Sequence, residues 1–187
     1  MIIHDDWLFV STMKCATNSL YAALPGVRYG RGFHPRPARG ERIRPLQWTV
    51  VRNPYDRAVS IWASTCLRDG DRYRAKARIR SVGRDPESFD DFVVACLANG
   101  YRWAGGHAWL FRNQADWLDG LVIDRVARFS DLESDVAAII GEAISIPAKN
   151  ESEHGFYRDH YTRDETWHAV TRWAGGDLDP EFGGDDL

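Results

Sequence analysis

Apolar and polar positions alternate along the chain in a way that predicts strands and helices in turn. The first apolar run, 7–10 (Trp-Leu-Phe-Val), is short and continuous, which is typical of a buried strand, and we place this strand at 7–12. Small and hydroxyl-bearing residues follow it. Apolar periodicity from Leu20 to Leu24 then predicts a helix over 18–24. The chain is therefore expected to begin with a strand, a loop and a helix.

A second strand is predicted by the apolar, β-branched run 46–51, and we place it at 47–52. This run ends in Arg52-Asn53-Pro54. Proline suits the first turn of a helix because its missing N–H has no partner there in any case. A helix is therefore expected over 55–68, directly after the second strand.

The rest of the chain continues the alternation of strands and helices. We expect a short strand at 27–29, a strand at 121–129, and helices at 88–98, 132–144 and 163–173. The arginine-rich segment up to Asp85 lacks apolar periodicity, so 70–84 is expected to be a mobile or lid-like loop. Such alternation predicts an α/β fold, a parallel sheet flanked by helices on both faces, in a single domain over 1–187. Ligands of such sheets bind at the carboxyl ends of the strands.

The loop after the first strand has the composition of an anion site. It contains Lys14, and Thr17, Asn18 and Ser19 stand at the start of the expected helix, where backbone N–H groups and the helix dipole attract phosphate-like groups. The same residue types also cap helices, so a capped helix beside a solvated lysine remains an alternative. No glycine lies between Met1 and Pro25, which excludes a Walker A loop and disfavours an ordinary ATPase or kinase.

A second anion-binding segment is predicted where the second strand ends. Arg52 stands at the strand end, and Arg57 and Ser60 lie three residues apart on the expected helix, where they share a face. Guanidinium groups suit forked contacts to phosphate. Two guanidinium groups and a hydroxyl at a strand end therefore form a second expected anion-binding segment.

These two segments together resemble the donor-binding motifs of sulfotransferases that use 3′-phosphoadenosine 5′-phosphosulfate (PAPS). The lysine loop with Thr-x-Ser is similar to the family's 5′-phosphosulfate loop, and Arg-Asn-Pro-x-x-Arg-x-x-Ser is similar to its 3′-phosphate motif. The resemblance implies a P-loop-like sulfotransferase fold and PAPS as donor, with adenosine 3′,5′-bisphosphate as product. The donor-binding residues it implies are Lys14, Cys15, Ala16, Thr17, Asn18, Ser19, Arg52, Arg57 and Ser60.

Later segments resemble the Golgi-type carbohydrate branch of this family in the same order. They are Gly106-His107 followed by Gln114, the run from Val122 to Asp135, and Asn150 with the segment 157–161. Three positions depart from the family pattern. Met13 stands where proline is often found, Ala16 where glycine is common, and Asn53 where aspartate is frequent. None of the three removes a charged ligand of the donor.

The catalytic residues are expected from the chemistry of sulfuryl transfer. The leaving bisphosphate must be stabilised, which we assign to Lys14, and the acceptor hydroxyl must lose a proton to a base. His34 lies between the two motifs, at a place where the carbohydrate branch has its base, and an unperturbed pKa near 6.5 suits the task. His107 and a carboxylate such as Glu41 remain alternatives.

Composition and charge narrow the class of protein. No apolar stretch is long enough for a membrane span, and the start lacks the basic residues of a signal peptide, which predicts a cytoplasmic protein similar to short bacterial or viral forms of the family. The net charge is −3, with arginine clusters at 28–44 and 68–84. These clusters could bind a polyanion or could simply be solvated surface. Neither a nucleic-acid motif nor a metal-binding spacing of the three cysteines is present.

The expected partner is a small-molecule or carbohydrate acceptor, with no nucleic acid, membrane or metal. Two other classes stay open. One is a kinase-like enzyme that uses ATP and Mg²⁺, and the other is a non-catalytic nucleotide-binding protein of the same fold.

Overall fold

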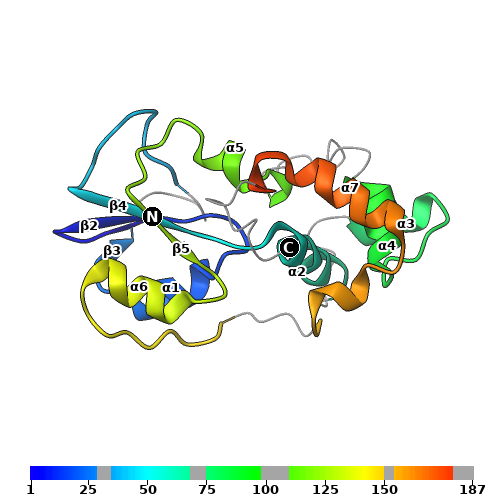
Figure 1. Ribbon diagram of the computed structural model, residues 1–187. Helices are drawn as coiled ribbons and strands as arrows, with labels where there is room; N and C mark the ends of the chain where they lie inside the picture. Colours follow the sequence, from blue (N-terminus) through cyan, green and yellow to red (C-terminus); the bar gives the residue numbers. More distant parts are fainter. Residues whose placement is uncertain (29–34, 68–74, 98–109, 150–153, 179–187) are drawn as a thin grey trace. The chain divides into compact units, whose positions relative to one another are not determined.

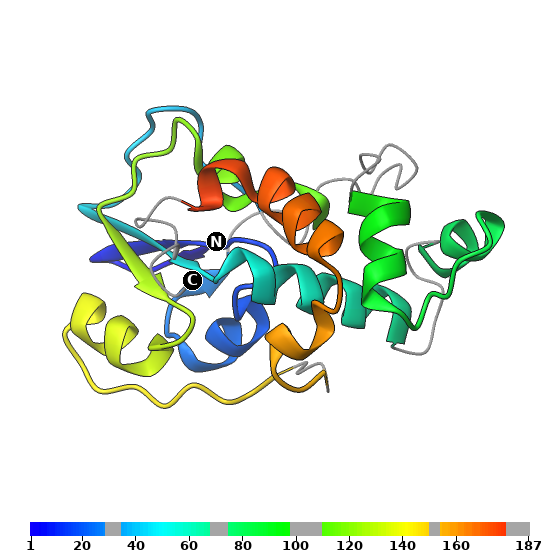
Figure 2. The ribbon, with the colours of Figure 1, turned by 45° about the vertical axis from the view of Figure 1, so that its right-hand side comes forward.

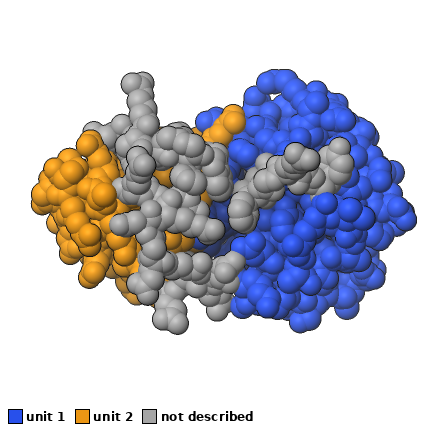
Figure 3. All heavy atoms as spheres, turned by 180° about the vertical axis from the view of Figure 1, so that it is seen from behind, with its two compact units in different colours: residues 1–53, 114–151, 179–187 blue, residues 54–113, 152–178 orange. Residues whose placement is uncertain are grey.

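The structure of the chain is a computed structural model that describes residues 1–28, 35–67, 75–97, 110–149 and 154–178. The chain divides into two compact units, which Figure 3 colours separately. The sheet unit comprises residues 1–53, 114–151 and 179–187, and the helical unit comprises residues 54–113 and 152–178. The expectation of a single domain stays a prediction, because this division does not show whether either unit folds alone.

The sheet unit is built on five strands in the order β3-β1-β2-β4-β5 (Figure 1). Their bounds are β1 (Ile2–Ile3), β2 (Trp7–Val10), β3 (Val27–Arg28), β4 (Leu46–Val51) and β5 (Arg125–Arg128). Strands β2, β4 and β5 run parallel, as predicted, whereas β1 is antiparallel to both β2 and β3. The sheet is therefore mixed, and the prediction of a fully parallel sheet is wrong at this edge.

The antiparallel edge follows from the short connection between β1 and β2. Residues 4–6 alone separate the two strands, and the N–H of His4 donates a hydrogen bond to the carbonyl of Trp7 at 2.9 Å. A parallel pair needs a crossover of a dozen residues or more, so such a short link permits only a hairpin. The apolar start of the chain, Met1 to Ile3, was not recognised as a strand in the sequence because it is so short.

Helices cover both faces of the sheet, as the sequence predicted. Figures 1 and 2 show α1 (Thr17–Ala23) and α6 (Leu132–Ile140) side by side on one face, with α5 (Gln114–Leu118) on the other. Alternate strand residues point to opposite faces. The core under α1 and α6 includes Phe9, Trp48, Val50, Ala127, Leu20 and Val136. The core on the α5 side includes Met1, Leu8, Val10, Val51 and Leu118.

The helical unit contains the helices predicted at 55–68, 88–98 and 163–173. The first is α2 (Pro54–Trp62) continued by the π-helical segment η1 (Ala63–Leu67), and the second is α4 (Phe89–Phe92) continued by η2 (Val93–Leu97). The third is α7 (Asp164–Ala174), flanked by the 3₁₀ segments η4 (Tyr157–His160) and η5 (Gly175–Leu178). None of the described helices is long and apolar enough to cross a membrane.

The prediction of a loop over 70–84 is wrong at residues 75–81, while 82–84 are non-helical. Residues Ala75–Ser81 form a further helix, α3, while 70–74 lie outside the described residues. Ala75 and Ile79 are four residues apart, and both are buried. Two apolar anchors on one side are enough to fix a two-turn helix, and a search for longer periodicity misses such a short pattern.

The bounds of the two elements that follow α5 also differ from the prediction. Helix α6 ends at Ile140 rather than 144, because Gly141 follows it in the left-handed conformation, with φ of 79°. Strand β5 begins at Arg125 rather than at 121, and before it the N–H of Leu121 donates to the carbonyl of Leu118 in the turn that follows α5. Helix α5 itself was not predicted.

Candidate functional site

The lysine loop, residues 11–16, connects β2 to α1 at the carboxyl end of the sheet. Lys14 and Ala16 have positive φ angles of 63° and 55°, and they are the non-glycine residues with positive φ in the described part of the chain. The left-handed conformation costs such residues about 1–2 kcal/mol each. Loops that include left-handed residues can form backbone concavities that bind anions, and backbone strain of this kind is concentrated at functional sites.

The turn of the lysine loop is fixed by hydrogen bonds at its base. The hydroxyl of Thr17 donates to the carbonyl of Thr12 at 2.8 Å, and the N–H of Leu20 donates to the carbonyl of Ala16 at 2.9 Å. The family resemblance had marked Ala16 as a position where glycine is common. The left-handed φ of Ala16 gives the physical reason, since glycine adopts that conformation without strain.

Cys15 lies between the two left-handed residues and is fully buried. Its thiol donates a hydrogen bond to Oε1 of Gln114 at 3.0 Å. Cys15 is therefore a small buried residue of the loop. Lys14 and Ala16 on either side are half-buried. The loop thus buries its middle side chain fully, while its lysine is only partly buried.

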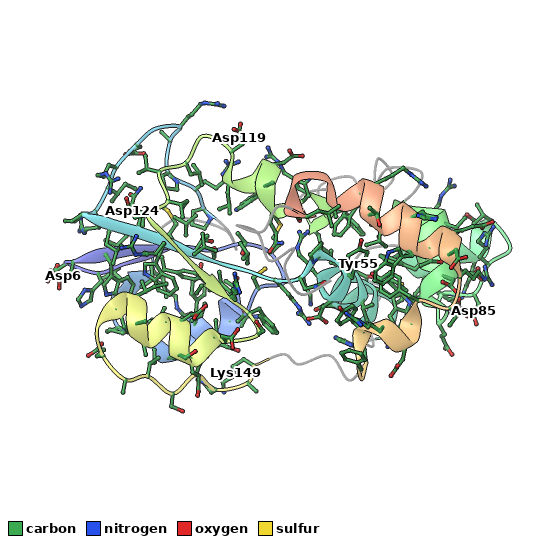
Figure 4. The ribbon with its side chains drawn as sticks, viewed as in Figure 1. Asp6, Tyr55, Asp85, Asp119, Asp124 and Lys149 are labelled. Carbon is green, nitrogen blue, oxygen red and sulfur yellow. The ribbon has the colours of Figure 1, made fainter. Side chains whose placement is uncertain are left out.

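The first turn of α1 carries the remaining residues of the first motif. Asn18 is exposed, whereas the side chain of Ser19 is nearly buried. The backbone N–H of Lys149, which Figure 4 labels, donates to the hydroxyl oxygen of Ser19 at 3.0 Å. This bond uses a lone pair of Ser19, so its hydroxyl hydrogen can still be donated to a ligand.

Arg52 lies beside the lysine loop, immediately after β4. Because β2 and β4 are adjacent and parallel, their carboxyl ends meet at one edge of the sheet. Nη1 of Arg52 donates to the carbonyl of Lys14 at 3.2 Å, and its guanidinium carbon lies 4.2 Å from the ring centre of Phe129. The structure therefore brings the Lys14 and Arg52 segments together at the carboxyl ends of their strands, where the sequence placed both motifs.

Gln114 connects these two segments, a role that the sequence did not indicate. Its Oε1 accepts the N–H of Arg52 at 2.9 Å as well as the thiol of Cys15, and its Nε2 donates to the carbonyl of Arg52 at 2.9 Å. The side chain is 1 % exposed. The only signal in the sequence was its place in a segment that resembles the carbohydrate branch of the family, without an assigned function.

Arg57 and Ser60 lie on α2 in the helical unit, and both are buried there. Arg57 is fully buried, with Nη1 3.7 Å from a carboxylate oxygen of Asp177. Its Nη2 also donates to the carbonyl of Arg112, and its guanidinium lies over the ring of Trp173. These contacts give Arg57 a structural role within the helical unit. Donor binding by Arg57 and Ser60 stays a prediction from the motif.

The candidate bases are only partly described. His34 and His107 lie outside the described residues, so their roles stay predictions. Glu41 lies towards the amino-terminal end of β4, because its carbonyl accepts a bond from Gln47, the second residue of that strand. Lys14 is at the opposite end of the sheet. The described residues contain no group of three or more His, Cys, Asp or Glu side chains that could bind a metal ion.

The described part of the sheet unit thus joins Lys14, Arg52 and Gln114 in one network at the carboxyl ends of β2 and β4. Its charged groups are cationic, and its buried amide fixes backbone positions. Comparison of the chain with models of protein families, with curated proteins and with solved structures finds no match.

Proposed function

We propose that the protein is a sulfotransferase that moves a sulfuryl group from PAPS to the hydroxyl of a small-molecule or carbohydrate acceptor. The observation that carries the proposal is the contact between the two motif segments, in which the Arg52 guanidinium donates to the carbonyl of Lys14. Segments 38 residues apart in the sequence supply two cationic side chains at one edge of the sheet. A donor with phosphate groups at both ends requires cations of this kind.

The lysine loop suits the 5′ side of such a donor. Lys14, the left-handed backbone around Cys15 and the hydroxyl of Ser19 would bind the 5′-phosphosulfate. As the bond between sulfur and the 5′-phosphate oxygen breaks, Lys14 would stabilise the charge that develops on that oxygen. The acceptor oxygen forms the new bond to sulfur and gives its proton to the base, for which His34 and His107 are the candidates.

Arg52 is assigned to the 3′-phosphate. The test compares the binding of adenosine 3′,5′-bisphosphate and of 5′-AMP to the parent chain and to Arg52→Ala by calorimetry. We expect Arg52→Ala to weaken bisphosphate binding about 10–100-fold and AMP binding much less, since only the bisphosphate carries the 3′-phosphate. Arg125→Ala, at the exposed start of β5, is the matched control and should leave both affinities unchanged. Equal losses for both ligands would reject the assignment of Arg52.

Turnover tests the reaction itself. Incubation with sulfur-labelled PAPS and a panel of glycans, alcohols, amines and phenols should label at least one acceptor. No bisphosphate binding and no labelled product would overturn the proposal.

The kinase-like alternative predicts different requirements. A shift of the melting temperature by ATP with Mg²⁺ but not by the bisphosphate would favour it, as would turnover that EDTA abolishes and Mg²⁺ restores. A sulfotransferase of this kind should keep its activity in EDTA, because protein cations stabilise its leaving group.

A further inference from the structure

Gln114 binds the backbone of Arg52 as a neighbouring strand would. Val51 is the last residue of β4 that is paired with β5, so Arg52 is the first residue beyond the sheet. The side-chain amide of Gln114 accepts the N–H of Arg52 and donates to its carbonyl, both at 2.9 Å. Only this orientation of the amide satisfies both groups. The amide therefore continues the hydrogen bonding of the strand by one residue, at the point where the candidate site begins.

The same amide oxygen also binds the lysine loop. Oε1 of Gln114 accepts a hydrogen bond from the Cys15 thiol at 3.0 Å, and the guanidinium of Arg52 donates one to the carbonyl of Lys14 at 3.2 Å. The contacts form a closed ring of Gln114, Arg52, Lys14 and Cys15. All of these residues belong to the sheet unit. Movement of the Gln114 amide would therefore displace both the loop that carries Lys14 and the backbone that carries Arg52.

Gln47 shows what a buried glutamine does elsewhere in the same unit. It is fully buried in β4, its Nε2 donates to the carbonyl of Val122 at 2.7 Å, and its Oε1 accepts the N–H of Ile43 at 2.7 Å. It lies at the amino-terminal end of the strand, away from the lysine loop. Gln47 thus matches Gln114 in residue type, burial and bonding to the backbone, but it contacts neither motif segment.

We propose that Gln114 is a positioning residue that fixes the lysine loop and Arg52 relative to each other, and so sets the spacing of the two anion-binding groups. The part of this inference that concerns the donor rests on the proposed function. Gln114 is not expected to touch the donor. It acts through Arg52 and Cys15, which distinguishes it from a residue that only fills the core.

The first test compares Gln114→Met with Gln47→Met in the full chain, since methionine has a similar length but no hydrogen-bonding amide. Both variants should lower the urea midpoint of unfolding. Only Gln114→Met should weaken adenosine 3′,5′-bisphosphate binding, by about tenfold, because two anion-binding groups lose their fixed spacing. Gln47→Met should stay within about twofold of the parent. Equal weakening by the two variants would reduce Gln114 to a core residue and overturn the inference.

A second readout does not depend on the proposed function. Hydrogen exchange of the loop amides 13–17 should become about tenfold faster in Gln114→Met than in the parent, while the amides of β2 keep their protection. Gln47→Met should leave the loop amides unchanged. If the parent chain does not bind the bisphosphate, the proposed function fails, and exchange alone decides the positioning role. Unchanged loop exchange in Gln114→Met would overturn it.

Gln114→Glu provides a conservative variant with a pH-dependent effect. Its carboxylate can accept the N–H of Arg52 but cannot donate to the carbonyl until it is protonated. Bisphosphate affinity relative to the parent should therefore be low at pH 8 and recover as the pH falls. If the ratio of the bisphosphate affinities of variant and parent stays constant as the pH falls from 8, the assigned role of Nε2 is contradicted. This variant also covers the case in which Gln114→Met does not fold.

Discussion

The sheet unit and the helical unit both bury polar side chains, but they bury different kinds. In the interior of the sheet unit these groups are neutral and bind the backbone. The hydroxyl of Thr49 on β4 donates to the carbonyl of Val10 on β2, and the hydroxyl of Thr12 donates to the carbonyl of Val50 on β4. Gln47 and Gln114 each form hydrogen bonds with several backbone groups. Neutral side chains thus fix the strand ends and the loop.

The helical unit buries ionisable side chains as well as neutral hydroxyls. Arg57 faces Asp177, and the side chains of both are 0 % exposed. The carboxylate of Asp90 on α4 accepts hydrogen bonds from Thr162 and Thr166, and it lies 3.6 Å from the guanidinium of Arg163. Removing one partner of a buried neutral bond leaves a polar group unsatisfied and costs about 1–3 kcal/mol. A charge left without its partner in the interior costs more, about 3–5 kcal/mol. The two units should therefore respond very differently to single substitutions.

The largest expected effect is the loss of the buried cation. Arg57→Met removes the guanidinium and leaves the carboxylate of Asp177 buried without its main counter-charge. The free energy of unfolding should fall by about 3–5 kcal/mol, measured by urea unfolding of the full chain at pH 7. The double variant Arg57→Met/Asp177→Leu should recover most of that loss. A single-variant loss below about 1 kcal/mol would show that the pair does not stabilise the unit.

This substitution also bears on what the sequence could predict. Arg52 stands at a strand end, and Arg57 and Ser60 are three residues apart on one face of the following helix, which suggested that both arginines face one anion. The partner of Arg57, Asp177, is 120 residues away in the chain, and no local pattern indicates such a long-range pairing. The alternation of apolar runs did predict the parallel strands β2, β4 and β5, since a buried strand has the same pattern wherever it lies.

The candidate site, like the fold, could be predicted only in part from the sequence. Lys14 and Arg52 each follow an apolar strand, so the sequence could predict that they meet at one edge. The contribution of Gln114 could not be predicted, because it depends on a fully buried amide reaching two loops at once. Likewise, the left-handed φ of Lys14 and Ala16 contradicts the ordinary preference of these residues, and only the structure could reveal it.

A medium effect on the free energy of unfolding is expected from pH, through one carboxylate in each unit. Burial raises the pKa of Asp91, but bonds from the N–H of Asp85 and the guanidinium of Arg84 outweigh it, so the pKa lies below its usual value of 3.8. In the sheet unit, hydrogen bonds from Arg42 and the N–H of Gln47 lower the pKa of Asp124, which Figure 4 labels beside β5. A lowered pKa contributes stability above the unfolded value, and this contribution is lost as the pH falls through the folded value.

Substitution by asparagine removes the charge of each carboxylate and so measures its pH-dependent contribution to stability. Asp91→Asn and Asp124→Asn should each lower the free energy of unfolding by about 1.5 kcal/mol at pH 7, since their arginine partners are partly exposed. The difference from the parent should shrink progressively below about pH 4. Urea unfolding at several pH values measures it. A difference that stays constant down to pH 2 would contradict the lowered pKa values.

A smaller effect is expected from a single buried hydroxyl, and its size should depend on the unit. Thr49→Val removes the bond between β4 and β2 and should cost about 1 kcal/mol, because the carbonyl of Val10 loses a partner. Thr65 in η1 is also buried, but its hydroxyl donates to the carbonyl of Ile61 one turn earlier. Such local bonds add little to a helix, so Thr65→Val should cost only a few tenths of a kcal/mol. Equal losses of stability by Thr49→Val and Thr65→Val in thermal unfolding would contradict this difference between the two hydroxyls.

The last substitution, alanine to glycine, should have effects of opposite sign in the two units. Ala16 in the lysine loop has a φ of 55°, where glycine is favoured, whereas Ala77 is an exposed residue in the middle of α3. Ala16→Gly relieves about 1–2 kcal/mol of left-handed strain and loses part of that gain to the greater freedom of glycine in the unfolded chain, so the net stabilisation should be about 0.5 kcal/mol. Ala77→Gly should destabilise by about 1 kcal/mol, because glycine is a poor helix former. The same substitution thus tests whether the loop is strained, as measured by chemical unfolding of both variants. If Ala16→Gly destabilises the chain as much as Ala77→Gly does, the loop does not store strain. Its unusual backbone would then give no support to an anion site at Lys14.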